Sequence, residues 1–376
     1  MKTKASLADK VLPKPVQDAI ERTIEPHIYE RASGIGVCST KTAKERRQHI
    51  RATVATLWQL GSKIQKLESL SPKHIALLTA HWDQEGMSPE FLHNRLSVLR
   101  TLAGWMGKRN LVGDLGDYFE KARTQRTTAT EVDKSWKGKE IDVEAIIARA
   151  TQIDERLGVM IALMDRFGLR VKEAIEFRPA QALVDGGTAI EVFAGTKGGK
   201  LRRVPVETDQ QRETLAWARD VVAQGRVKRV RWPELTWKKA QSRFYNTIQR
   251  KLGIAKAQLG VTMHGLRHGY GQRGYEKVAG VPSPIVYANA NHGGENGSGG
   301  LGGEGGSDGE GSVGGESRGP SGTRSRPLEP PAGLTREKHR EASMAVSRWL
   351  GHGRVDVTAA YYGTYGHAFR RSRRNE

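Results

Sequence analysis

The sequence predicts a mainly α-helical fold with one small antiparallel β-sheet, in the α+β class. Apolar residues recur at three- and four-residue steps through most of the chain, which is the period of an amphipathic helix. Only residues 189–206 alternate in the manner of paired strands around a glycine-rich turn. A length of 376 residues allows two globular units, so we expect two helical domains, the second carrying the sheet.

The first part of the chain predicts an arm followed by a helical bundle. Pro13, Pro15 and Pro26 interrupt residues 1–40, which show little periodicity and are expected to form a poorly defined amino-terminal arm. Residues 41–112 are expected to form the bundle. Two of its helices begin where serine precedes proline, and behind the second start lies one apolar stripe: Ser71-Pro72, Ser88-Pro89, then Phe91, Leu92, Leu96, Leu99, Leu102 and Met106.

The polar, threonine-rich residues 113–140 predict an interdomain linker, and residues 141–376 a second domain. Its expected elements follow in order: helices at 142–168 and 170–177, strands at 189–193 and 201–206 around a turn at 195–200, and helices at 208–225 and 236–252. About half of residues 293–317 are glycine, and five are acidic. Such a composition cannot build a core, so we expect a disordered insertion at about 281–340.

The charge of the chain favours a polyanionic partner. A formal net charge of +20 indicates nucleic acid first and a membrane surface second, because Lys and Arg bound to phosphates release condensed counterions. No apolar run is long enough to span a bilayer, so a soluble, cytoplasmic protein is expected. Cys38 is the only cysteine, which excludes a disulfide framework and a cysteine-ligated zinc site within one chain.

Five short motifs carry residues suited to phosphodiester chemistry. Attack on a phosphodiester requires a nucleophile, cations for the nonbridging oxygens and an acid for the leaving oxygen. Each motif alone is a weak signal, because a lone arginine is usually a surface cation. In chain order they are Gly168-Leu-Arg170-Val-Lys-Glu173, Lys197-Gly-Gly-Lys200-Leu-Arg-Arg-Val-Pro, His264-Gly-Leu-Arg267-His268, Leu350-Gly-His352 and Tyr361.

Together these motifs resemble the tyrosine recombinase (phage integrase) family over roughly residues 40–376. The resemblance implies a helical core-binding domain and a catalytic domain that form a C-shaped clamp on double-stranded DNA attachment sites. It also implies recombination for a prophage or related mobile element through a 3′-phosphotyrosyl intermediate, with no metal, ATP or other cofactor. A homo-tetramer with one dimer on each site, accessory DNA-bending proteins and a location at the nucleoid follow from the same resemblance.

The resemblance also assigns roles to single residues. It makes Tyr361 the nucleophile, with Tyr362 as its rival, while Arg170 and Arg267 hold the nonbridging oxygens. Lys197 is the expected general acid and Lys200 the alternative.

The remaining site residues are expected to assist these groups. His264 would act as a general base or contact the phosphate, and His352 would contact the phosphate and orient Tyr361. Glu173 would support the arginines from behind, unless it forms an ordinary surface pair with a lysine. His268 is expected to pack beneath the site.

Basic residues outside the motifs are candidates for contacts with the DNA backbone, although a solvated charged face is an alternative. They lie in the bundle and in the helix that precedes the His-x-x-Arg motif: Lys41, Lys44, Arg46, Arg47, Arg95, Lys238, Lys239 and Arg243. Four carboxy-terminal arginines are further candidates: Arg370, Arg371, Arg373 and Arg374.

One feature departs from the family pattern, and two rival functions stay open. Arg267 and His352 are 85 residues apart, whereas the family spaces them by about two to three dozen, and the glycine-rich insertion accounts for the excess. Loop closure costs only about 0.6 kcal/mol per doubling of length, so the insertion is compatible with one intact site. The rivals are a catalytically inactive DNA-binding protein of the same fold and a type IB topoisomerase-like strand transferase.

Overall fold

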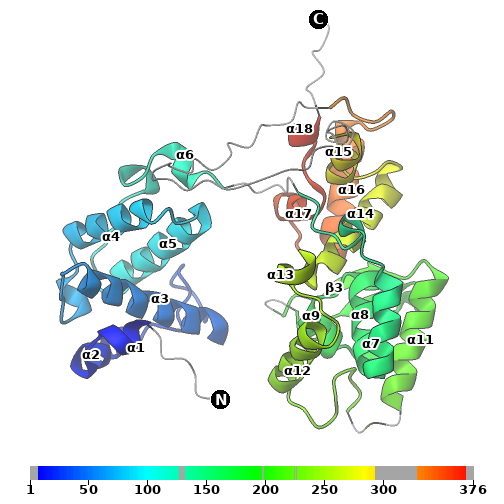
Figure 1. Cartoon of the computed structure of the whole chain (residues 1–376), viewed down its shortest axis with the longest axis horizontal. Coiled ribbons are helices and arrows are strands. Elements are labelled where there is room, and N and C mark those ends of the chain that lie inside the picture. Colours follow the sequence, from blue (N-terminus) through cyan, green and yellow to red (C-terminus); the bar gives the residue numbers. More distant parts are fainter. Residues whose placement is uncertain are drawn as a thin grey trace, which may run out of the picture. The chain divides into compact units, whose positions relative to one another are not determined.

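The chain divides into two compact units, residues 1–127 and 128–376. A computed structural model describes residues 7–126, 132–196, 199–223, 225, 227–292 and 328–369. The fold is mainly helical with one small antiparallel sheet, which confirms the predicted class (Figure 1). Among the described residues, no helix combines the length and the apolar character that crossing a membrane requires.

Unit 1 is a helical bundle in which two helix starts and the buried residues of α5 agree with the sequence pattern. Its elements are α1 Leu7–Val11, α2 Lys14–Ile24, α3 Thr40–Gln59, η1 Leu67–Ser69, α4 Pro72–Gln84, α5 Pro89–Trp105, η2 Leu115–Asp117 and α6 Lys121–Thr124. Helices α4 and α5 begin at the two predicted prolines, and the Ser88 hydroxyl accepts a hydrogen bond from the Phe91 amide. The predicted stripe on α5 is buried at Leu92, Leu96, Leu99 and Leu102.

The structure corrects the expectation of a poorly packed arm over residues 1–40. Helix α2 buries Val16, Ile20 and Ile24 in the core of unit 1. Pro13 precedes this helix and Pro15 lies in its first turn, where the missing proline N–H costs nothing, so these prolines start a helix instead of breaking one. The expected linker at 113–140 also begins inside unit 1, because Phe119 belongs to the same core.

Unit 2 holds the remaining elements. Its helices are η3 Lys137–Lys139, α7 Val143–Ile153, α8 Glu155–Phe167, α9 Val171–Ile175, α10 Pro179–Ala182, η4 Asp185–Gly187, α11 Asp209–Ala223, α12 Trp237–Arg250, α13 Lys256–Leu259, α14 His264–Ala279, α15 Pro284–His292, α16 Arg336–Trp349, α17 Val355–Tyr362 and α18 Tyr365–Ala368. The helix predicted at 142–168 is two helices, because Asp154 caps a second helix that begins at Glu155, with its carboxylate accepting from the Arg156 amide.

The sheet of unit 2 contains the predicted strand pair and one short additional strand. The strands β1 Leu183–Val184, β2 Ala189–Val192 and β3 Arg202–Pro205 are antiparallel in that order. In the register of β2 and β3, Val192 lies opposite Arg202. Arg202 and Val204 both face the interior, and Arg203 between them is exposed. An arginine therefore lies on the same buried face as an apolar residue.

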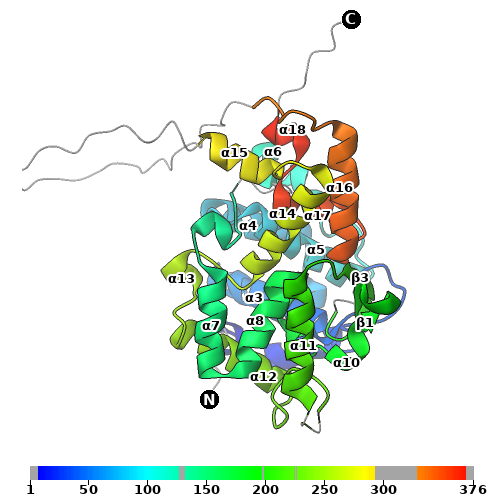
Figure 2. The same ribbon diagram turned by 90° about the vertical axis from the view of Figure 1, so that its right-hand side faces the viewer.

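Helix packing brings distant segments together. Helix α8 is buried on nearly all sides and contacts α7, α11 and α14 (Figure 2). Helices α14, α16 and α17 contact one another, which joins the His-x-x-Arg motif to the two motifs that follow the glycine-rich stretch. The bounds 281–340 expected for the insertion are too wide, because α15 and the start of α16 lie within them. The prediction of disorder for residues 293–317 lies outside the described residues.

Candidate active site

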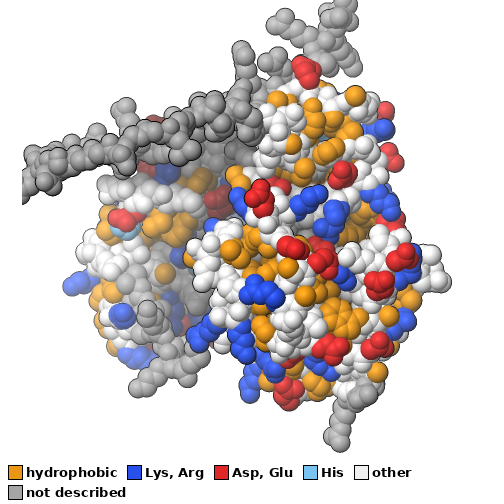
Figure 3. Space-filling model, turned by 45° about the vertical axis from the view of Figure 1, so that its right-hand side comes forward, with side chains coloured by type: hydrophobic (Ala, Val, Ile, Leu, Met, Phe, Trp, Pro, Cys, Tyr) orange, Lys and Arg blue, Asp and Glu red, His pale blue; other side chains and the backbone are white. Residues whose placement is uncertain are grey.

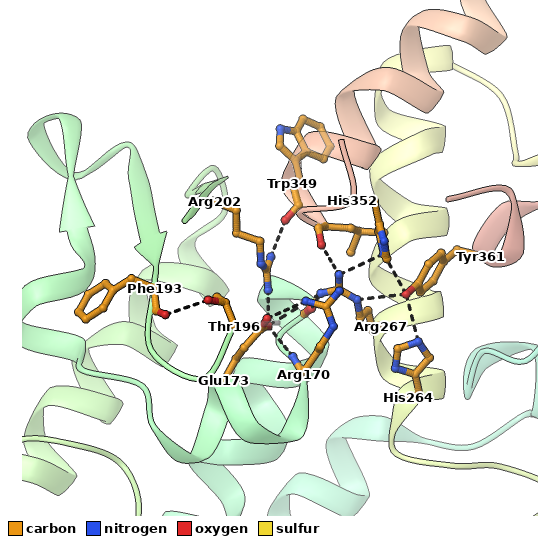
Figure 4. A network of polar contacts seen from close by, with 12 residues as sticks. Arg170, Glu173, Phe193, Thr196, Arg202, His264, Arg267, Trp349, His352 and Tyr361 are labelled. Atoms are coloured by element: carbon orange, nitrogen blue, oxygen red, sulfur yellow. Dashed lines mark hydrogen bonds and ion pairs between the residues drawn. The ribbon is translucent and has the colours of Figure 1, made fainter. Parts of the chain in front are cut away.

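The motif residues of unit 2 converge from separate elements (Figure 4). Arg170 precedes α9, His264 begins α14, and Arg267 follows one turn later. His352 lies in the loop between α16 and α17, and Tyr361 lies in the last turn of α17. Three segments that are distant in sequence, at Arg170, at 264–267 and at 352–361, therefore supply one cluster.

A glycine makes the turn before Arg170. Gly168 ends α8 in the left-handed region with φ +60°, and a Cβ there would lie 2.5 Å from the ring of Tyr270. Both its backbone conformation and its close approach to the ring require glycine. The turn places Arg170 beside α9 and the Gly168 carbonyl within reach of Arg267.

The Tyr361 hydroxyl lies at the centre of the cluster. It is 3.1 Å from Nε2 of His264, 3.1 Å from Nε2 of His352 and 3.4 Å from Nε of Arg267. The tyrosine is almost fully buried, whereas His264 is exposed, so the histidine marks the solvent side of the cluster. Two imidazoles and a guanidinium thus contact a single hydroxyl oxygen.

Arg267 joins three elements from a fully buried position. Its guanidinium donates to the carbonyl oxygens of Gly168 and Leu350, and its Nη2 lies 3.4 Å from Nε2 of His352. Burial, and after it the charge of Arg202, lowers the pKa of Arg267 to about 10. The guanidinium therefore remains positively charged at neutral pH.

Glu173 balances the arginines of the site. Its buried carboxylate accepts from Nη1 of Arg170 at 2.7 Å and from Nη2 of Arg202 at 2.5 Å, and it lies 4.0 Å from Arg267. Burial opposes ionisation of this carboxyl, but Arg202, Arg267 and Arg170 together hold its pKa below the ordinary value. Glu173 thus lies behind the arginines and is not an exposed partner of a lysine.

Arg202 is a member of the cluster that lies within the second motif, although the sequence pattern assigned it no role. Its side chain is 2% exposed, and it donates to the Trp349 carbonyl as well as to Glu173. The sequence of β3 indicated that Arg202 is buried, because residues two apart in a strand face the same side and Val204 is apolar. A charge on the inward face of a strand indicates a buried partner.

The histidines of the site favour the neutral form. Burial, followed by the charges of nearby arginines, lowers the pKa of His352 to about 4. Burial, with a contribution from Lys134, likewise brings the pKa of His268 to about 4, and the pKa of His264 is also lowered. His268 is buried with its ring 4.6 Å from that of Tyr361, so it packs against the tyrosine.

Tyr362 lies apart from this cluster. Its ring packs against Tyr275 and His339, and its hydroxyl donates to the Ser343 carbonyl at 3.5 Å. Burial raises the pKa of Tyr362 to about 12. Of the two adjacent tyrosines, only Tyr361 contacts the histidines and arginines of the motifs.

The structure describes only one of the two candidate general acids, Lys200. Lys197 lies outside the described residues. Lys200 is exposed, and its Nζ lies 2.7 Å from the position that a Cβ on Gly353 would occupy. This places Lys200 beside the loop that carries His352.

The candidate DNA-binding residues of unit 1 differ in accessibility. Arg46 is buried: it donates to the Glu30 carbonyl and lies against the Trp105 ring, which corrects its expected place on the surface. Arg47 pairs with two glutamates, Arg95 stacks on Phe91, Lys41 pairs with Glu45, and Lys44 is exposed. Arg46 therefore helps to hold unit 1 together.

The candidates of unit 2 lie on α12. Lys238 and Lys239 are exposed, whereas Arg243 pairs with Asp154 at 2.8 Å and with Glu234 at 3.1 Å. On the face that Figure 3 shows, Lys and Arg side chains are interspersed with Asp and Glu side chains. The carboxy-terminal arginines lie outside the described residues.

Comparisons with known proteins support the family and the fold. A family model described as phage integrase, N-terminal, matches residues 26–112, and a model described as integrase matches residues 124–273. No curated relative matches the chain.

Two solved structures of the Tn1549 transposon integrase with circular intermediate DNA are similar in fold, each at 12% identity. One covers 94% of this chain and 97% of its own with a TM-score of 0.52. The other covers 95% and 98% with a TM-score of 0.50.

Proposed function

The chain belongs to the phage integrase family of tyrosine recombinases and is a site-specific DNA recombinase; we propose that Tyr361 is its nucleophile. The observation that carries the assignment is the position of the Tyr361 hydroxyl between His264, His352 and Arg267. A hydroxyl in contact with neutral imidazoles and a guanidinium has both a proton acceptor and a source of positive charge within reach.

The proposed reaction is a transesterification. The Tyr361 oxygen forms a bond to the scissile phosphorus, and the bond between phosphorus and the 5′-oxygen of the DNA breaks. The product is a 3′-phosphotyrosyl bond and a free 5′-hydroxyl. Attack of another 5′-hydroxyl on this bond releases Tyr361 and joins the new strand, so the energy of the broken bond is retained throughout.

Positive charge for the nonbridging oxygens comes from Arg170 and Arg267. Arg170 has a side chain that is 26% exposed, and Glu173 holds it from behind, so its free edge is available to a phosphate. Arg267 extends its Nε to the Tyr361 hydroxyl, where the phosphorus would have to lie during attack. Planar guanidinium groups suit this role because they present paired donors to phosphate oxygens.

The hydrogen-bond pattern favours His352 as the acceptor of the Tyr361 proton. A guanidinium only donates, so its contact with Nε2 of His352 makes that nitrogen an acceptor. The Tyr361 hydroxyl then donates to His352, and His264 donates to the Tyr361 oxygen. We infer that Lys197, or Lys200 beside the His352 loop, protonates the leaving 5′-oxygen.

The partner that fits this chemistry is double-stranded DNA with attachment sites of a prophage or related mobile element. The net charge of +20 supports a polyanionic partner, and the Tn1549 integrase is in complex with DNA. We further propose a dimer on each site, a tetramer during strand exchange, and help from DNA-bending proteins. A nucleoid location would follow from DNA binding.

A nicked suicide substrate tests the assignment. Cleavage next to the nick releases a short fragment that diffuses away, so the covalent protein–DNA complex accumulates and can be separated on a denaturing gel. Wild type and Tyr362→Phe should form the complex, because Tyr362 lies in the core away from the site. Tyr361→Phe should form none. A complex that persists in Tyr361→Phe and disappears in Tyr362→Phe would overturn the assignment.

A further inference from the structure

The backbone carbonyl of Tyr361 is also held by a hydrogen bond from a neighbouring helix. Tyr361 lies in the last turn of α17, where carbonyl groups have no partner within the helix. Its carbonyl accepts a hydrogen bond from Nε2 of Gln272 on α14 at 3.3 Å. A side chain of another helix therefore satisfies a carbonyl that has no partner within its own helix.

Gln272 is in turn oriented by a residue from the start of unit 2. Its Nε2 donates to Oδ1 of Asp133 at 2.8 Å, and the same oxygen accepts from the Ser135 amide at 2.8 Å. Asp133 and Gln272 are both buried. Because a carboxylate only accepts, it directs the amino group of Gln272 toward itself and toward the Tyr361 carbonyl.

Helix α14 contacts both ends of the tyrosine. His264 in its first turn meets the Tyr361 hydroxyl, and Gln272, eight residues later, meets the Tyr361 carbonyl. Eight residues of α-helix span about 12 Å, and a helix is rigid over that length. The hydrogen bond at the carbonyl, together with the packing of α14 on α17, therefore restrains the position of α17 relative to the helix that carries His264 and Arg267.

We propose that Gln272 and Asp133 form a positioning pair that aligns Tyr361 for attack on the phosphate. The pair touches neither the hydroxyl nor the nonbridging oxygens, so it acts through the backbone of the nucleophile. This inference rests on the proposed role of Tyr361. It assigns a function to the buried segment around Asp133, which was expected to be linker.

Single-turnover cleavage of the suicide substrate at saturating protein tests the pair. Gln272→Met keeps the volume of the side chain and removes the donor. It should slow cleavage by about 10- to 100-fold, the penalty typical of a displacement near 1 Å. The dissociation constant for DNA should stay within about twofold, because no DNA-facing group changes. Asp133→Ala should behave in the same way.

Two further variants separate positioning from simple packing. Asp133→Asn keeps an oxygen that accepts from Gln272 and should retain nearly the wild-type rate. The double variant Asp133→Asn with Gln272→Glu restores a hydrogen bond between the two side chains, but it presents a carboxylate to the Tyr361 carbonyl. It should remain slow although its melting temperature is close to that of wild type.

The outcomes distinguish this inference from the proposed function. Cleavage by Gln272→Met within twofold of wild type, or full activity of the double variant, would overturn the positioning role. A parallel loss of melting temperature, DNA affinity and rate in both Gln272→Met and Asp133→Asn would also overturn it, because it would indicate general unfolding. Failure of the wild type itself to attach to DNA would instead overturn the role of Tyr361.

Discussion

Nη2 of Arg202 lies 2.5 Å from a carboxylate oxygen of Glu173, and both side chains are buried. The same carboxylate holds Arg170 and lies near Arg267, so one negative charge serves three positive charges. Removal of Arg202 would leave Glu173 paired with Arg170, but it would take away the donor of the Trp349 carbonyl and one donor of the carboxylate, and a buried acceptor without its partner is costly. Arg202 therefore connects the stability of unit 2 to the geometry of its active site.

Arg202→Ala should lower the stability of unit 2 by about 1 to 3 kcal/mol and reduce cleavage, because two buried acceptors lose a donor. Thermal unfolding and single-turnover cleavage would measure the two effects. The matched control is Arg203→Ala on the same strand, because Arg203 is 58% exposed and pairs with Asp185 and Glu191. Exposed pairs contribute about 0 to 1 kcal/mol, so the control should stay near wild type. Equal stability losses in the two variants would contradict the buried role of Arg202.

Gly168→Ala should destabilise unit 2 and slow cleavage. The left-handed conformation alone costs an alanine about 1 to 2 kcal/mol. The new Cβ would also meet the Tyr270 ring at 2.5 Å and displace the turn that leads to Arg170. Gly260→Ala is the control: Gly260 also has a positive φ, but open space surrounds the added Cβ. Similar melting temperatures for the two variants would show that the close approach to Tyr270 is unimportant.

The sequence predicted the residues that carry out the chemistry better than the residues that hold them in place. His264, Arg267, His352 and Tyr361 belong to short motifs, and helix packing brings them together despite the 293–327 gap in the described residues. Gln272 and Asp133 belong to no motif, because their role depends on a contact between segments 139 residues apart. Such a contact leaves no local pattern.

In the fold, too, features that depend on neighbouring residues were predictable, whereas features that depend on distant contacts were not. Serine before proline marked the starts of α4 and α5 correctly, because capping depends on neighbouring residues. The prolines around α2 obscure its helical pattern in the sequence, and only tertiary contacts show that Ile20 and Ile24 are core residues.

Stability should fall on acidification from about pH 6.5 toward pH 4. Burial holds the pKa of His268 and His352 near 4, whereas an unfolded histidine titrates near 6.5. Between these values the unfolded chain binds more protons than the folded one, so stability rises with pH across this window. Melting temperatures at closely spaced pH values would show the slope. His268→Asn and His352→Asn should each flatten it, and an unchanged slope in both would contradict these pKa shifts.

His352→Gln should slow cleavage more than His264→Gln. Glutamine cannot accept a proton as imidazole does, so loss of the acceptor should cost about 10²- to 10⁴-fold. At position 264 the glutamine amide can still donate toward the Tyr361 oxygen from near the position of the imidazole Nε2, and we expect about a tenfold loss, within the range for a hydrogen-bond donor of this kind. Single-turnover rates at saturating DNA would rank the two variants. The opposite ranking would assign the Tyr361 proton to His264.

A substrate with sulfur in place of the bridging 5′-oxygen identifies the general acid. A thiolate leaves without protonation, so the sulfur substrate should restore cleavage in a variant that lacks the acid and in no other. Lys197→Met should lose about 10²- to 10⁴-fold on the oxygen substrate and recover on the sulfur substrate. Lys200→Met is the matched control from the same turn, with its Nζ beside Gly353. Rescue of Lys200→Met in place of Lys197→Met would move the acid to Lys200, and rescue of neither would exclude both lysines from protonating the leaving oxygen.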